Sequence, residues 1–218
     1  MVKFPGNNKI NLAIFISGRG TNFKSIFNFA KKKKSILNIK LVISDNKYAK
    51  GLEFSKKKKI STKVIKFVKK RDAENKILKL IKSNKIDLIC LAGFMKILSE
   101  NFLEKCNLKI LNIHPSLLPK YKGLNTHQRA IDAKDDVHGV SVHFVTEELD
   151  GGPVILQAKV PVLADDTADT LAKRVHAQEH IIYPLVVKWF SEQRLTMEAD
   201  YAVLDEKQLP AHGAHYPK

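Results

Sequence analysis

Three residues in the second half of the chain have side chains suited to proton transfer and to stabilising a negative charge. Asn112 and His114 lie two residues apart in "LNIHPSLLP", and a strand that ends at Pro115 would place both on one face. One amide donor and one titratable imidazole would thus lie close together at the carboxyl end of a strand. A histidine that only ends a strand is the alternative interpretation.

A carboxylate that could act on His114 follows later in the chain. Asp150 stands in "ELDGGP", where two glycines allow a sharp bend. A carboxylate beside an imidazole favours the charged ring, so His114 would be a proton donor near neutral pH. Asp-Gly is also common in ordinary turns, so the residues alone leave both interpretations open.

A second candidate site lies near the N-terminus, where "AIFISGRGTNF" (13–23) runs from an apolar strand into a helix start. Gly18 and Gly20 would leave backbone N–H groups at the positive end of the helix dipole, which suits an anion. The stretch lacks the third glycine of the dinucleotide fingerprint and the Lys-Ser or Lys-Thr of a P-loop. It therefore predicts a site for a single phosphate group, with a structural turn as the alternative.

The elements that must position these residues alternate along the chain. Apolar runs at 10–16, 38–44, 62–68, 86–92 and 108–113 read as strands, and amphipathic segments lie between most of them. This pattern predicts an α/β fold with a Rossmann-like, mostly parallel sheet and flanking helices, and ligands bind outside the carboxyl ends of strands in such sheets.

The second half of the chain has a different pattern. A short helix at 126–133, two strands at 139–145 and 154–162, and a long C-terminal helix at 167–190 with a kink at Pro184 are expected. We expect the residues after them to pack as an extended tail or to fray. We expect one domain, 1–218, with an N-terminal lobe at 9–113, a C-terminal lobe at 114–195 and a tail at 196–218.

The composition indicates in which environment the protein works and which kinds of partner it has. The chain has 218 residues and a formal net charge of +16, but only 5 of its 38 basic residues are Arg, and the lysines form runs at 31–34 and 56–59. No aromatic residues interleave these runs, so they predict a solvated surface rather than a nucleic-acid site. Two cysteines make no disulfide framework, and no apolar run is long enough to cross a membrane. We expect a cytoplasmic protein.

Five motifs together carry a resemblance to a known family. The stretches "ISGRGTN", "LAGFMKILS", "LNIHPSLLPKYKGLNTH", "HGVSVHFVTEELDGGPVILQAKVPV" and "QEHIIYPL" resemble, in this order, the glycinamide ribonucleotide formyltransferases, folate-dependent enzymes of purine biosynthesis. The resemblance covers about residues 9–195 and is loose only at 31–85. It implies transfer of a formyl group from 10-formyltetrahydrofolate to the primary amine of glycinamide ribonucleotide, with no metal.

The resemblance also implies roles for particular residues. Asn112, His114 and Asp150 match the family's catalytic residues. Lys96 stands where bacterial relatives usually carry Arg, and Lys lacks the planar fork of Arg. The residues that match the family's ribonucleotide site are Gly20, Thr21, Asn22 and Glu179. Those that match its folate site are Arg71, Met95, Lys96, Ile97, Leu98, Asn112, Thr146, Glu147, Glu148, Leu149 and Asp150.

Other functions fit parts of the same sequence. Methionyl-tRNA formyltransferase has a similar core with an added basic domain, and formyltetrahydrofolate hydrolase shares the catalytic residues but carries an N-terminal regulatory domain. A nucleic-acid-binding protein without activity is a third alternative. His176 and His180 lie four residues apart, as zinc ligands can, yet no third ligand follows, and a phosphate contact by His176 is the better interpretation. The protein is expected to be a monomer or a homodimer that binds small molecules.

Overall fold

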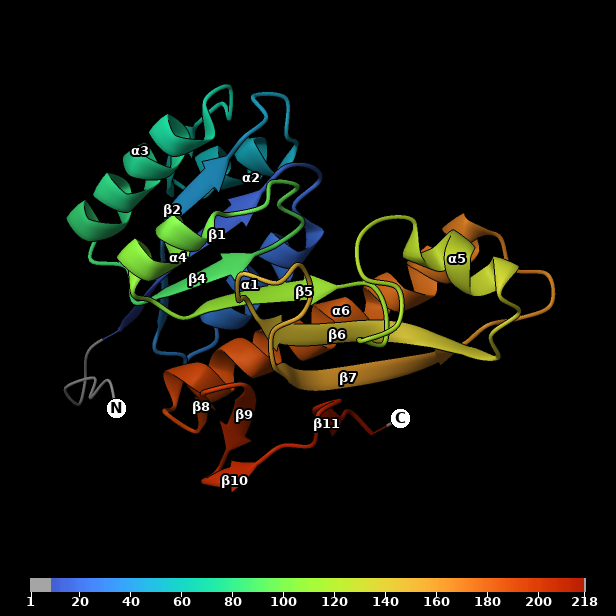
Figure 1. Cartoon of the computed structure of the whole chain (residues 1–218). Coiled ribbons are helices and arrows are strands. Elements are labelled where there is room, and N and C mark those ends of the chain that lie inside the picture. The colour runs from blue at the N-terminus through green and yellow to red at the C-terminus, as the bar shows by residue number, and fades with distance from the viewer. Residues whose placement is uncertain (1–8, 218) are drawn as a thin grey trace. The chain divides into compact units, whose positions relative to one another are not determined.

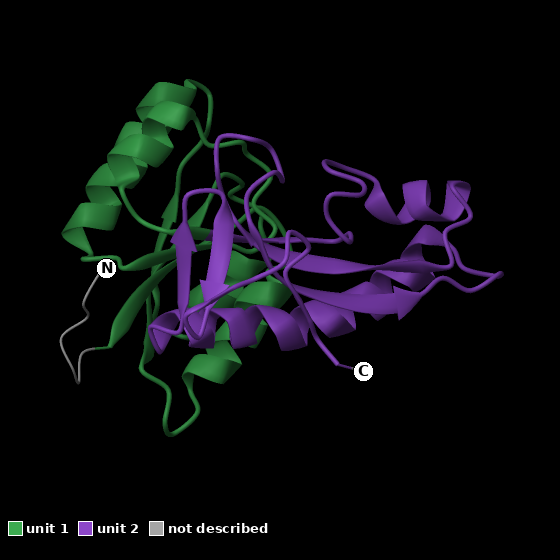
Figure 2. Cartoon of the chain, turned by 60° about the horizontal axis from the view of Figure 1, so that its bottom comes forward, with its two compact units in different colours: residues 1–110 green, residues 111–218 purple. Residues whose placement is uncertain are grey.

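The structure, a computed structural model, describes residues 9–217 (Figure 1). The chain forms two compact units, unit 1 up to Ile110 and unit 2 from Leu111 (Figure 2). The organisation as one domain with two lobes stays a prediction.

Unit 1 is a parallel sheet with helices between successive strands. The strand order is β4-β1-β2-β3, and all three neighbouring pairs are parallel. Its elements are β1 (Ile10–Ile16), α1 (Thr21–Ala30), β2 (Leu37–Ser44), α2 (Gly51–Lys57), β3 (Ser61–Val64), α3 (Lys70–Ser83), β4 (Leu88–Leu91) and α4 (Glu100–Cys106).

The core of unit 1 follows from its apolar runs. Residues 12–16 of β1 are all buried, as expected of a strand covered on both faces, and α3 buries Ala73, Ile77 and Ile81 along one side. The strand predicted at 62–68 is shorter than expected. Its partner β2 ends at Ser44, so the pairing stops at Val64 and the last bond is Ile65 N–H to the Ser44 carbonyl, at 2.8 Å.

Unit 2 contains the mixed strands and the long helix that the sequence predicts. Strand β6 pairs antiparallel with both β5 and β7, and β11 is parallel to β7. The elements are β5 (Ile110–His114), α5 (Thr126–Asp132), β6 (Val137–Phe144), β7 (Val154–Pro161), α6 (Ala168–Ser191), β8 (Leu195–Glu198), β9 (Tyr201–Leu204), β10 (Lys207–Gln208) and β11 (Ala214–His215). The predicted α/β fold class is confirmed.

Helix α6 supports the strands of unit 2. It begins with a capping box between Thr167 and Thr170, and it packs against β6 and β7. The buried Tyr183 hydroxyl donates to the Leu111 carbonyl at 3.0 Å, which ties the helix to β5. The helix continues to Ser191 through Pro184.

The prediction of an extended tail is wrong. Strands β8, β9 and β10 form a small antiparallel sheet, and β11 adds to β7. Ala199, Asp205 and Glu206 take positive φ angles in the tight turns that join β8 to β9 and β9 to β10. Ala199 and Glu206 are not residue types that favour positive φ, so the usual signal for such turns is missing at these two positions.

Candidate active site

The first part of the site is the carboxyl end of β5. Asn112 is paired with His143 across the antiparallel β5–β6 ladder, and His114 is paired with Ser141. Directly opposite residues in such a ladder have side chains on one face. Asn112, His114 and His143 therefore lie on the same side of the sheet in unit 2, and His114 and His143 are both buried.

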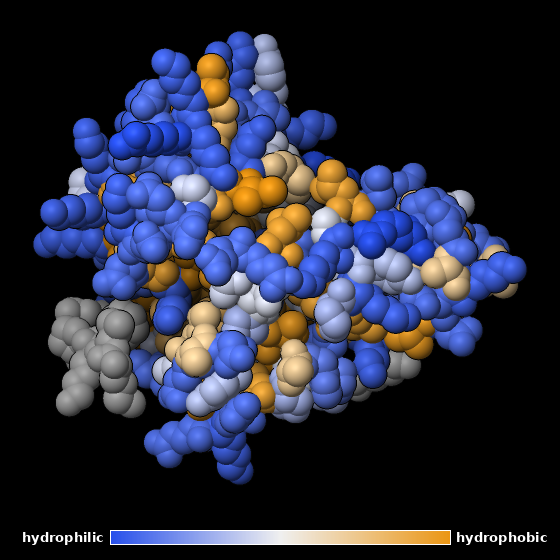
Figure 3. Space-filling model, viewed as in Figure 1, coloured by the Kyte–Doolittle hydropathy of each residue, from blue (hydrophilic) through white to orange (hydrophobic). Residues whose placement is uncertain are grey.

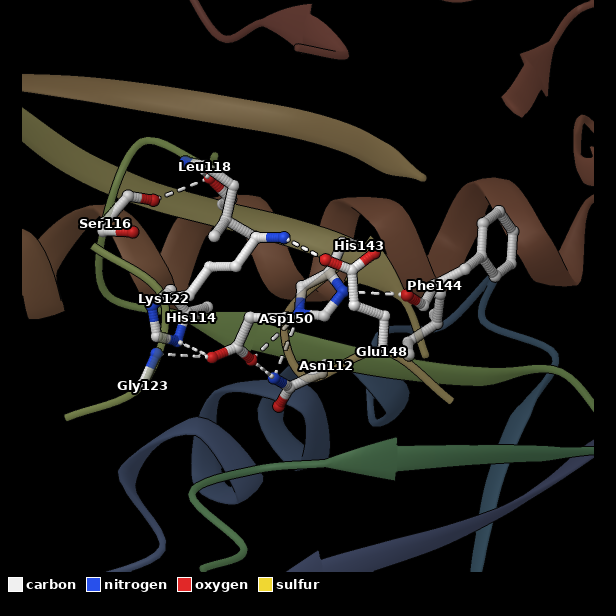
Figure 4. A network of polar contacts seen from close by, with 12 residues as sticks. Asn112, His114, Ser116, Leu118, Lys122, Gly123, His143, Phe144, Glu148 and Asp150 are labelled. Atoms are coloured by element: carbon white, nitrogen blue, oxygen red, sulfur yellow. Dashed lines mark hydrogen bonds and ion pairs between the residues drawn. The ribbon is translucent and has the colours of Figure 1, made fainter. Parts of the chain in front are cut away.

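Asp150 lies against these side chains (Figure 4). Its Oδ2 is 3.3 Å from His114 Nδ1, and its Oδ1 is 3.5 Å from Asn112 Nδ2 and 3.7 Å from His143 Nε2. The backbone N–H of Gly123 also donates to Oδ2, at 2.9 Å. The structure thus brings together the three residues that match the family's catalytic set, and the Asp150 side chain is only 8% exposed.

A tight turn places the carboxylate there. Asp150 has a φ of 49°, a left-handed conformation that Asp tolerates better than most residues. Gly152 follows where any Cβ would collide with the Phe144 carbonyl. The sequence "LDGGP" therefore folds back onto the end of β6 and carries Asp150 to the end of β5.

Both ring nitrogens of His114 face acceptors. Nε2 donates to the Tyr121 carbonyl at 2.8 Å, and Nδ1 faces the Asp150 carboxylate. Since a carbonyl and a carboxylate only accept, the surroundings of the ring favour an N–H on the nitrogen that faces each of them. The chain positions His114 as a donor, with one N–H directed at a loop carbonyl that a ligand oxygen could replace.

His143 is a site residue that the sequence does not reveal. Its Nδ1 donates to its neighbour's carbonyl, Phe144 O, at 2.8 Å, which leaves Nε2 of a neutral ring to accept from Asn112 Nδ2 at 3.1 Å. Burial lowers the pKa of His143 to about 4, against smaller opposing effects of the Phe144 carbonyl and Asp150. A neutral His143 therefore accepts a hydrogen bond from the Asn112 amide nitrogen. This bond fixes the orientation of the Asn112 side chain within the cluster.

The glycine stretch of unit 1 forms the start of α1, and residues 18–22 are called the phosphate loop below. Gly20 is the N-cap, with a left-handed φ of 70°, and no side chain caps the helix. The first turn of α1 holds no acidic residue. Gly51 at the start of α2 packs against this loop, and its N–H donates to the Gly18 carbonyl at 3.1 Å. This open helix end with its positive dipole is suited to an anion.

The residues expected to contact folate fall in separate segments. In unit 1, Met95 and Ile97 are 62% and 57% exposed and Leu98 is buried; residues 95–98 are called the folate segment below. Arg71 is exposed in the first turn of α3. In unit 2, the turn Thr146, Glu147, Glu148 and Leu149 is open to solvent or half-buried, and Leu149 is 49% exposed.

The polar residues of α6 occupy different environments. Glu179 is buried and has a polar partner, whereas His176 is half-buried with its ring near that of His127. Burial, with the neighbouring His138 and His176, lowers the pKa of His127 to about 4. Within residues 9–217, no group of three or more His, Cys, Asp or Glu could hold a metal ion.

The lysine runs lie on the surface of unit 1. Residues 31–34 and 56–59 are exposed, and Lys31 and Lys58 extend over the rings of Phe27 and Phe54. The ammonium nitrogens of Lys31 and Lys58 lie 5.4–5.7 Å from the ring centroids, the range of cation–π contacts. The molecular face in Figure 3 is mainly hydrophilic with scattered hydrophobic groups. Among the described residues, no helix is long and apolar enough to span a bilayer.

Unit 1 is a parallel α/β sheet, and unit 2 carries an amide, an imidazole and a carboxylate on an antiparallel ladder, an arrangement typical of an α/β enzyme. The chain belongs to the formyl transferase family, whose model matches residues 10–187. This membership confirms the resemblance carried by the sequence motifs.

Several relatives match this chain along nearly their whole length. The phosphoribosylglycinamide formyltransferase of Escherichia coli K12 is 45% identical over 94% of this chain and 98% of its own length. That of Haemophilus influenzae is 46% identical over 93% and 97%. A solved phosphoribosylglycinamide formyltransferase from Coxiella burnetii superposes with a TM-score of 0.91 at 43% identity, covering 96% of this chain and all of that chain.

Proposed function

We propose that this protein transfers the formyl group of 10-formyltetrahydrofolate to the primary amine of glycinamide ribonucleotide, giving formylglycinamide ribonucleotide and tetrahydrofolate in purine biosynthesis. The observation that carries the proposal is the buried contact of Asn112 and His114 with Asp150, on a chain that matches the E. coli enzyme almost from end to end. The two free cysteines agree with a reducing cytoplasm as the place of the reaction.

Asn112 and His114 stabilise the charge that develops as the amine attacks the formyl carbon. The formyl oxygen becomes an oxyanion and accepts from the Asn112 amide, whose bond to Asp150 is long at 3.5 Å and easily exchanged. It also accepts from His114 Nε2–H, in place of the Tyr121 carbonyl. Preorganised donors in a dry site act without reorganisation, and one such donor contributes on the order of a hundredfold in rate.

Asp150 holds His114 and takes part in proton movement. Its carboxylate faces His114 Nδ1 and so keeps the ring a donor at Nε2. The attacking amine loses a proton, which passes to the leaving nitrogen of the folate through a water held at Asp150. No covalent enzyme intermediate is needed, since none of the three residues acts as a nucleophile.

The ribonucleotide phosphate is assigned to the phosphate loop. The backbone of Gly20 and the start of α1, with the side chains of Thr21 and Asn22, form an anion site that suits one phosphate monoester. The buried Glu179 is assigned to the ribonucleotide as well, as an acceptor for its polar groups. A single phosphate does not require the three-glycine turn that binds a dinucleotide.

The folate is assigned to two segments, each described within its own unit. Exposed apolar side chains at Met95 and Ile97 provide contact area for the flat pterin ring. The turn 146–150 provides backbone groups and Leu149, and Arg71 and Lys96 provide positive charge for carboxylates. The protein works on these small molecules as a monomer or a homodimer, without a metal.

A spectrophotometric assay tests the proposal directly. Purified protein is given 10-formyltetrahydrofolate with and without glycinamide ribonucleotide, and conversion of the folate is followed. Turnover that depends on the ribonucleotide supports the proposed reaction. Turnover without it identifies a hydrolase, and no turnover in either case excludes both.

A further inference from the structure

Ser17 and Asp45 lie next to the two ligand segments of unit 1 and are assigned to neither ligand. Ser17 follows β1 and directly precedes the phosphate loop, and Asp45 follows β2. The folate segment follows β4, and β1 lies between β4 and β2 in the sheet. The carboxyl ends of three neighbouring parallel strands therefore meet at these residues.

Each polar atom of Ser17 has a partner. Its backbone N–H donates to the Gly93 carbonyl at 3.0 Å, and its carbonyl accepts from Asn46 Nδ2 at 3.1 Å. Its hydroxyl donates to Asp45 Oδ1 at 2.5 Å and accepts from the Met95 N–H at 2.8 Å. The first residue before the phosphate loop is thus bound to the first residue of the folate segment.

The carboxylate of Asp45 gives this chain of bonds its direction. A carboxylate only accepts, so the Ser17 hydroxyl must donate to it. The hydroxyl oxygen is then the acceptor of the Met95 N–H. The second oxygen, Oδ2, is 3.7 Å from Lys96 Nζ, and the Asp45 side chain is only 9% exposed. Asp45 therefore holds the folate segment twice, through Ser17 at Met95 and through the ammonium group of Lys96.

We propose that Ser17 and Asp45 are positioning residues that keep the phosphate loop and the folate segment in one fixed arrangement, so that loss of this link weakens the binding of both substrates together. The inference rests on the proposed function, which assigns a ligand to each segment. It predicts that a residue assigned to neither substrate affects the KM values of both.

The test compares Ser17→Ala with Ser17→Thr, which keeps the hydroxyl. Ser17→Ala leaves the Met95 N–H without its acceptor and Asp45 without its donor, so KM for each substrate should rise about fivefold or more. Amide hydrogen exchange in the protein without ligands should become faster in both 18–22 and 94–98. Ser17→Thr should give values close to those of the unaltered protein in both measurements. Asp45→Asn should have an intermediate effect, because the amide oxygen of Asn can still accept from Ser17 but does not attract Lys96.

Asp87→Asn is the matched control. Asp87 Oδ2 accepts the Asn11 N–H at 2.8 Å near the amino end of β1, so this variant also weakens a carboxylate bond to the strand, but at the end of β1 opposite to the two segments. It should lower stability and leave both KM values unchanged. A rise in only one KM for Ser17→Ala, unchanged exchange, or the same double rise in Asp87→Asn would overturn the inference. If the unaltered protein shows no ribonucleotide-dependent turnover, the proposed function is refuted instead. The hydrogen-exchange measurement would still decide whether Ser17 links the two segments.

Discussion

Gly20→Ala is the sharpest test of the phosphate loop, because the structure gives two separate reasons why a side chain should not be tolerated there. Gly20 has a left-handed φ of 70°, and an added Cβ would lie 2.9 Å from the Cα of Gly51. A left-handed conformation costs a residue with a Cβ roughly 1–2 kcal/mol. The Gly51 contact is with backbone, so it cannot be relieved by rotating a side chain.

The strain must appear in one of two measurements. If the loop keeps its conformation, the free energy of unfolding falls by about 1–2 kcal/mol or more. If the loop relaxes, the ribonucleotide must restore it on binding, and KM for the ribonucleotide rises about 5- to 30-fold for the same free energy. KM for 10-formyltetrahydrofolate should rise less, because Gly20 lies in the loop assigned to the phosphate.

Gly18→Ala provides the matched control two residues away. A Cβ at Gly18 would meet nothing within 4 Å, and its φ lies outside the left-handed range. Urea unfolding and steady-state kinetics on both variants separate strain from a general effect of replacing glycine. Equal results for the two variants, or an unchanged free energy of unfolding together with an unchanged KM in Gly20→Ala, would refute the assignment of the loop.

Two further changes test the cluster in unit 2, and a third tests the pH dependence of stability at His127. His114→Ala should lower kcat by at least about a hundredfold with a normal unfolding transition, and near-normal turnover would remove His114 from the mechanism. His143→Phe leaves the Asn112 amide and the Phe144 carbonyl without a ring partner, so kcat should fall about tenfold and stability by about 1–3 kcal/mol, whereas unchanged kcat would mean that Asn112 needs no orienting partner. The pKa of His127 is about 4 in the fold and 6.5 when unperturbed, so the unfolded chain takes up the proton first. The contribution of the neutral His127 ring to stability is complete above pH 6.5 and is lost as the pH falls toward 4. In urea unfolding at several pH values, the free energy of unfolding of His127→Gln should therefore fall less steeply with decreasing pH than that of the unaltered protein.

The fold could be predicted where a local pattern determines the element. The buried run of β1, the one-sided apolar pattern of α3 and the capping residue Thr167 of α6 each encode their element in neighbouring residues. The end of β3 could not be predicted, because it depends on where β2 ends rather than on the residues after Val64. The turns of the small C-terminal sheet could not be predicted, because Ala199 and Glu206 adopt positive φ although neither residue type favours it.

The contact of Asn112 with His143 depends on strand register, which no local pattern encodes. Asn112 and His114 share a face because they are two residues apart in one strand, and this much follows from the sequence. His143 meets Asn112 only because β6 pairs with β5 in one particular register, after a connection that contains α5. A slip of one residue would turn His143 to the other face, so that the Asn112 amide would lose the acceptor that orients it. The orientation of a catalytic donor is therefore a property of the antiparallel pairing in unit 2, and sequence motifs identify the donor without identifying what holds it.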